Sequence, residues 1–75
     1  MTPKLPAATA KDLVRIAEGL GFMFRRQHGS HAIYVRQSDQ ARVVIPMHTG
    51  EVKRKTLRAI IQDLKISVEE FGNML

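Results

Sequence analysis

Residues 27–34 are Gln27-His28-Gly29-Ser30-His31-Ala32-Ile33-Tyr34, a short polar turn followed at once by β-branched and aromatic side chains. This pattern predicts a β-hairpin, in which Gly29 can take the positive φ angle that short hairpin loops need. His31 is then expected to be the first residue of the second strand, beside a turn and close to the surface. An imidazole in such a place can donate or accept a proton near neutral pH, so His31 is the first candidate for chemistry.

The segments around this turn predict a small antiparallel sheet. Strands are expected over residues 22–27, 31–37 and 42–46. Because side chains alternate along a strand, Phe22 and Phe24 should lie on one face of the first strand, and Met23 and Arg25 on the other. Pro46 cannot donate to a ladder and should end the third strand. Three short strands joined by tight turns make a meander with one face exposed unless something covers it.

Two helices flank these strands. The first is expected over residues 10–20, with Thr9 as its N-cap and Gly21 at its end, and the second over residues 54–64. Each has an apolar stripe at i, i+3, i+4 and i+7, made of Leu13, Ile16, Ala17 and Leu20 and of Leu57, Ile60, Ile61 and Leu64. A capping box at residues 67–70 opens a last short helix. The order α-β-β-β-α predicts an α+β fold, a two-layer sandwich with both main helices on one face of a three-stranded antiparallel sheet.

Composition narrows the possible classes of protein. Hydrophobic residues make up 44% of the 75 residues, which is ordinary for a single globular domain. The chain has no cysteine, which excludes a disulfide framework, a thiolate zinc site and a cysteine nucleophile. It also has no apolar run long enough to span a membrane. Residues 1–9, with Pro3 and Pro6, are expected to form a flexible lead-in to one domain over residues 10–75.

Positive charge is concentrated in the middle of the chain. Residues 22–58 hold eight Lys and Arg against two Asp and Glu, a net charge of +6. Residues 59–75 hold one Lys against three Asp and Glu, a net charge of −2. The hairpin and the start of the second helix therefore form a surface suited to a polyanion such as RNA.

Four segments in register resemble the HicA (YcfA-like) toxin family. They are residues 26–34, 45–51, 55–60 and 67–71. The resemblance implies a double-stranded-RNA-binding-like fold and the activity of an mRNA interferase, an endoribonuclease of a type II toxin-antitoxin system in a bacterial or archaeal cytoplasm. It also implies a HicB-like antitoxin that masks the active site. The family's catalytic histidine, in its Gly-Ser-His motif, corresponds to His31, whereas Lys55 stands where the family usually has Gly.

RNA cleavage without a metal requires a base for the 2′-hydroxyl proton, an acid for the leaving oxygen and cations for the charge on phosphorus. His31 could be the base or the acid. His48 could be the second proton-transfer residue or a phosphate contact, or it could simply hydrogen-bond its own loop. The residues expected to contact RNA are Arg25, Arg26, Ser30, Lys53, Arg54, Lys55 and Arg58. No cofactor is expected. No metal site is expected either, because the three histidines have no carboxylate near them at ligand spacing.

The run Lys53-Arg54-Lys55 has two interpretations. Cations at a helix N-terminus oppose the helix dipole, and a docked phosphate would supply the missing negative charge. The run could equally be a solvated basic turn. Tyr34 could stack on a base, or it could be half-buried in the sheet. A non-catalytic RNA-binding module and an inactive antitoxin-binding subunit are the alternatives to an active nuclease.

Overall fold

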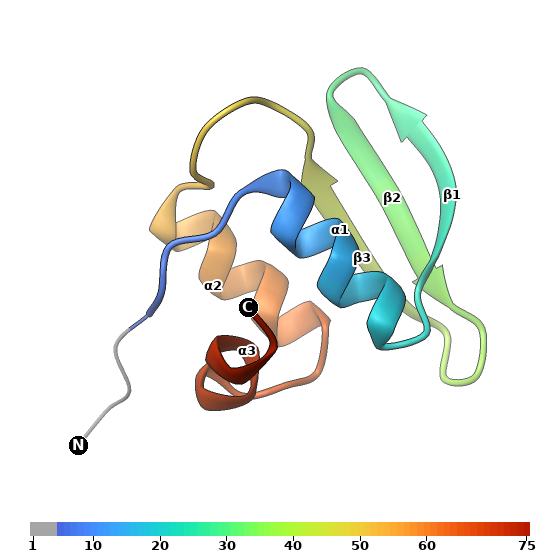
Figure 1. Cartoon of the computed structure of the whole chain (residues 1–75). Helices are drawn as coiled ribbons and strands as arrows, with labels where there is room; N and C mark the ends of the chain where they lie inside the picture. Colours follow the sequence, from blue (N-terminus) through green and yellow to red (C-terminus); the bar gives the residue numbers. More distant parts are fainter. Residues whose placement is uncertain (1–4) are drawn as a thin grey trace.

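A computed structural model describes residues 5–75 of the chain. The elements, in order, are α1 (Ala10–Gly19), β1 (Met23–His28), β2 (His31–Arg36), β3 (Ala41–Pro46), α2 (Arg54–Asp63) and α3 (Val68–Met74). The strands form one antiparallel sheet in the order β1-β2-β3, and the helices lie together on one side of it (Figure 1). The predicted α+β sandwich of the double-stranded-RNA-binding type is therefore confirmed, with α3 as an addition at the end of the helical layer.

Local signals set the helix ends as the sequence predicts. Thr9 caps α1, where its hydroxyl accepts from the backbone N–H of Asp12 at 3.3 Å and the Asp12 carboxylate accepts from the backbone N–H of Thr9 at 3.0 Å. Ser67 and Glu70 make the same reciprocal box at the start of α3, with both bonds at 3.0 Å. Gly21 follows α1 at a φ of +92°, a conformation that favours glycine and ends the helix.

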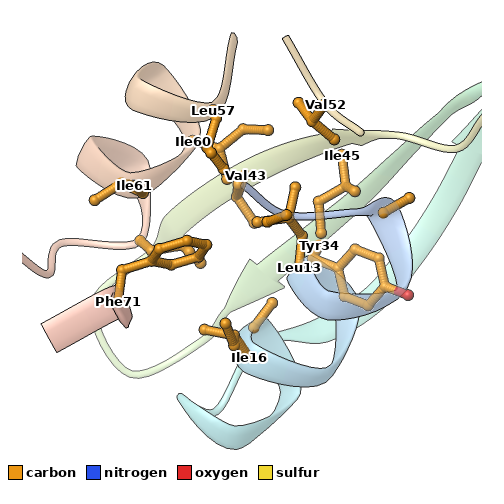
Figure 2. Packing of buried hydrophobic residues seen from close by; sticks show 14 of the residues in the cluster. Leu13, Ile16, Tyr34, Val43, Ile45, Val52, Leu57, Ile60, Ile61 and Phe71 are labelled. Carbon is orange, nitrogen blue, oxygen red and sulfur yellow. The ribbon is translucent and has the colours of Figure 1, made fainter. Parts of the chain in front are cut away.

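The core lies between the helices and the face of the sheet that they cover. Its largest fully buried side chains are Phe22, Phe71, Leu13, Ile16, Ile45, Leu57, Leu64 and Val43. Figure 2 shows side chains from α1, α2, α3 and the sheet meeting there. Tyr34 belongs to this cluster and is buried, not half-buried, so its ring is not available to stack on a base.

The first strand lies at the edge of the sheet beyond the helices, and all six of its residues are exposed. The predicted sides of the sheet are confirmed for its first residues, because Met23 and Arg25 line the open face whereas Phe24 contacts Tyr34 of the core. Beyond them the alternation breaks, because the pairing with β2 shifts by one residue between Phe24 and Arg26. This β-bulge at Arg25 adds one residue to the strand, so the side chains that follow it change faces of the sheet. Phe22 precedes the strand and is 2% exposed, whereas Phe24 is 54% exposed and contacts the Tyr34 ring edge-on at 5.6 Å.

The folded domain begins before α1. Leu5 and Ala8 are buried in the core, and the Ala8 carbonyl accepts from the backbone N–H of Val52 at 2.9 Å. Thr9 also forms an isolated antiparallel bridge with Glu51. Residues 5–9 are therefore packed against the domain, in contrast to the expected lead-in over residues 1–9, the first four residues of which lie outside the described part. No helix within residues 5–75 is long and apolar enough to span a membrane.

Candidate active site

The hairpin between β1 and β2 holds His31 at the surface. His28 pairs with His31 across the two strands, so the connecting loop is only Gly29 and Ser30. Gly29 has a φ of +61°, and its carbonyl accepts from the Gln27 side-chain amide at 3.0 Å. His31 is therefore the first residue of β2, as predicted, and its side chain is exposed.

The loop after β3 brings His48 to the same place. His31 pairs with Pro46 in the ladder, and the Ser30 carbonyl accepts from the backbone N–H of Met47 at 2.6 Å. These contacts join the hairpin turn to the loop that leads to α2. The two imidazoles therefore share one surface groove, which is lined by Ser30, His31, Val44, Pro46, His48, Val52, Lys53 and Thr56.

The two imidazoles in this groove differ in their surroundings. His48 Nδ1 lies 3.2 Å from the Thr49 carbonyl oxygen. Because a carbonyl can only accept, this bond places the proton on Nδ1 and leaves Nε2 free to accept another. No hydrogen bond reaches the His31 ring from the described residues, and no Asp or Glu lines the groove. Within residues 5–75, no three His, Cys, Asp or Glu side chains are grouped to hold a metal ion.

The N-terminus of α2 forms one wall of the groove and lacks the features of the other helix starts. Its N-cap is Lys53, which makes no capping hydrogen bond, and its first turn contains no acidic residue. Lys53 and Thr56 line the groove, whereas Arg54 and Lys55 are exposed beside it. Uncapped N–H groups and three cations thus meet at this helix end, where the dipole also favours an anion.

Not every predicted contact residue lies in this groove. Ser30 and Lys53 do, but Arg25 and Arg26 line a separate groove on the face of the sheet that the helices leave open. Arg58 is exposed on α2 and lines neither groove. Thr56 lines the groove but is not among the residues predicted from the sequence. Its position three residues after Lys53, which places both on one side of the helix, is the signal that could have identified it.

At the opposite end of the sheet, Asp39 forms ion pairs with Arg36 and Lys65. Arg36 donates to both oxygens of Asp39, at 3.0 and 2.9 Å, and Lys65 donates to one of them at 3.1 Å. The hydrogen bonds from Arg36 hold the pKa of Asp39 well below its ordinary value of 3.8. Arg36 also lies over the Phe22 ring at 4.6 Å and donates to the Leu20 carbonyl, so its role is to join the sheet to the end of α1.

Comparison with known proteins identifies the family. A comparison with curated protein sequences finds no match. The family model described as the HicA toxin of bacterial toxin-antitoxin systems matches residues 10–66, from the start of α1 to just before the cap of α3. The matched region contains the whole sheet, both main helices and every residue that lines the His31 groove. Because this match covers well over half of the chain, the protein belongs to the HicA toxin family.

Proposed function

We propose that this toxin is an endoribonuclease that cleaves mRNA in the His31 groove without a metal ion. The observation that carries the proposal is the convergence of two imidazoles, the Lys53 ammonium group and an uncapped helix N-terminus in one open groove with no carboxylate in its lining. These are the groups that transfer of a phosphoryl group from the 5′ oxygen to a ribose 2′-hydroxyl requires: a base, an acid and fixed positive charge.

The reaction needs two proton transfers. One imidazole takes the proton of the 2′-hydroxyl as its oxygen attacks phosphorus, and the other gives a proton to the 5′ oxygen as the P–O bond breaks. His31 and His48 are the two groups that we assign to these steps. His48 with its proton on Nδ1 presents a free Nε2, which suits it to accept a proton.

The developing negative charge on phosphorus needs donors that are already in place. Lys53 and the first N–H groups of α2 can supply them without reorganisation, because the helix holds the backbone donors fixed. The Ser30 hydroxyl can donate from the other wall. Arg54, Lys55 and Arg58 would then contact phosphates outside the groove and position the strand.

The antitoxin is the second partner that we propose for this surface. Membership of a toxin-antitoxin family implies an antitoxin. His31 is exposed, so a HicB-like protein could inhibit by covering the groove, and an acidic or phosphate-like surface would complement its cations. Inhibition would then be steric, with no change in the fold of the toxin.

The experiment that tests this function compares His31→Ala with a matched control, His28→Ala. His28 is also exposed and pairs with His31, but it does not line the groove. End-labelled single-stranded RNA is incubated with each purified protein in the presence of EDTA. We expect His31→Ala to slow cleavage about 10²–10⁴-fold, the usual contribution of a positioned acid or base. His28→Ala should cleave at nearly the wild-type rate.

Two further measurements separate catalysis from folding and binding. The His31→Ala substitution removes an exposed side chain, so the free energy of unfolding should change by less than about 1 kcal/mol. RNA affinity should be nearly unchanged, because phosphate contacts come from Lys and Arg. Normal cleavage by His31→Ala would contradict the assignment, and a wild-type protein that binds RNA without cleaving it would identify a binding module instead.

A further inference from the structure

The open face of the sheet carries a second groove. Met23, Ile33 and Val35 contribute apolar surface to it, and Arg25, Arg26 and Arg42 contribute charge. Ile33 is only 7% exposed, yet it does not belong to the core cluster beneath the helices. It is buried on the other face of the sheet, among the side chains of the neighbouring strands. This groove therefore has an apolar floor and a basic rim.

The β-bulge explains why two consecutive arginines line this groove. In a regular strand, Arg25 and Arg26 would point to opposite faces. The register shift between Phe24 and Arg26 removes that alternation, and both residues line the groove on the open face. Bulges commonly re-aim a side chain in this way beside functional sites. On β3, Arg42 pairs with Val35 and adds a third guanidinium to the same face.

These three cations have no internal partner in the described part of the chain. Among residues 5–75, no salt bridge or side-chain hydrogen bond involves Arg25, Arg26 or Arg42, and no Asp or Glu lines the groove. Arg36, which also lines it, is neutralised by Asp39. Like charges gathered on one face repel each other, so a bound polyanion would stabilise this arrangement.

The second groove leads directly to the first. His31, Ile33 and Val35 alternate along the open side of β2, and Ile33 pairs with Val44, which lines the His31 groove. Arg42 pairs with Val35, which is four residues along β2 from His31. At a rise of about 3.3 Å per residue, this corresponds to about 13 Å along the strand. A ligand held at His31 therefore needs to extend only a short distance to reach the three arginines.

We infer that the open face of the sheet is a binding track for single-stranded RNA leading away from the His31 groove. Arg25, Arg26 and Arg42 contact successive phosphates, and an unpaired base lies against Ile33 and Val35. A duplex cannot use the apolar floor, because its bases are stacked inside the helix. That the track starts at the His31 groove rests on the proposed function. RNA binding by the open face does not depend on cleavage, so it can be tested separately.

The test compares two double variants of equal charge, both made in His31→Ala so that the RNA stays intact. R25Q/R42Q removes two cations from the track, whereas R15Q/K65Q removes two from the helical layer, where Arg15 and Lys65 lie near Asp12 and Asp39. Glutamine keeps most of each side-chain stem. The probe is an unstructured RNA of about twelve nucleotides, within the range of known single-strand sites. Affinity is measured over a series of salt concentrations, with circular dichroism as the check on folding.

We expect R25Q/R42Q to lower the salt slope by about 1.4 and the affinity about tenfold at 0.15 M salt, from about 0.7 per lost phosphate contact. R15Q/K65Q should change both by much less.

The possible results are distinguishable. Equal effects of the two double variants would overturn the track. So would a loss of antitoxin binding by R25Q/R42Q with RNA affinity unchanged, since that result would make the open face a protein-docking surface. A wild-type protein that cleaves nothing, combined with weakened RNA binding by R25Q/R42Q, would refute the nuclease function and support the track.

Discussion

The two faces of the sheet are built from alternate residues of the same strands, yet they carry opposite chemistry. On the face under the helices, β2 and β3 contribute Tyr34, Val43 and Ile45, all buried in the core. On the open face they contribute His31 and Arg42, both exposed. Because the side-chain period of a strand is two residues, one strand can stabilise the domain on one side and bind a ligand on the other.

The three helix starts are likewise divided between stabilising the domain and binding a ligand. α1 and α3 begin with complete capping boxes, whereas α2, whose start lines the His31 groove, begins at Lys53 with no cap. A cap is worth about 1 kcal/mol to a helix, and cations at its start reduce its stability further. The domain thus omits a stabilising feature at the helix start that contributes Lys53 and Thr56 to the candidate active site.

The largest effect is expected from two adjacent residues of β3. Ile45 is fully buried under the helices, so Ile45→Ala should lower the free energy of unfolding by about 2–5 kcal/mol. Val44 lies on the open face, and Val44→Ala should lower it by less than about 1 kcal/mol. Urea denaturation of both variants measures the difference. Similar losses would mean that the open face also contributes to the core.

The next effect concerns the basic helix start. Replacing Lys53, Arg54 and Lys55 together by Ala should lower the salt slope of RNA binding by about 0.7 for each lost contact, or about 2 in all. The fold should remain, because Arg54 and Lys55 are exposed and Lys53 lies outside the core. Filter binding across a salt series measures the slope, with Arg15→Ala as a single-charge control. An unchanged slope would favour a solvated basic turn.

A smaller effect should appear when α2 receives the cap that it lacks. Lys53→Ser places a hydroxyl at the N-cap and should raise the free energy of unfolding by about 0.5–1 kcal/mol, while RNA affinity falls. Ser67→Ala at the N-cap of α3 is the reciprocal control, since it should destabilise the domain and leave RNA binding intact. Thermal melts and RNA titrations of both variants measure these changes. A gain in stability with no loss of affinity would separate Lys53 from RNA binding.

The smallest effect on stability is expected at Asp39, which pairs with Arg36 of the sheet and with Lys65 of the helical layer. Folding lowers the pKa of this carboxyl, chiefly through its hydrogen bonds with Arg36. A group with a lowered pKa stabilises the folded state above its unfolded pKa, and that contribution is lost as the pH falls below about 4. Asp39→Asn should therefore melt at a lower temperature than wild type at pH 7, and the difference should shrink in acid. A constant difference from pH 7 to pH 3 would contradict this linkage.

Local sequence signals account for most of the secondary structure. The apolar stripes around Leu13 and Leu57, the caps at Thr9 and Ser67, and the turn at Gly29 each depend on residues a few positions apart. Interactions of that range have the same geometry in any fold, so their patterns can be read directly. His31 could be placed at a strand start for the same reason.

The meeting of His31, His48 and Lys53 and the common direction of Arg25 and Arg26 depended on the tertiary structure. The first requires the hydrogen bond from Met47 to Ser30, between segments far apart in the chain, and the second requires a one-residue slip between β1 and β2. The burial of Leu5 and Tyr34 likewise depends on which surfaces the helices cover. Sequence by itself determined the elements and the chemical groups that they carry, because those signals are local. Only long-range pairing decided which groups share a surface, because register and layer packing are properties of the whole domain.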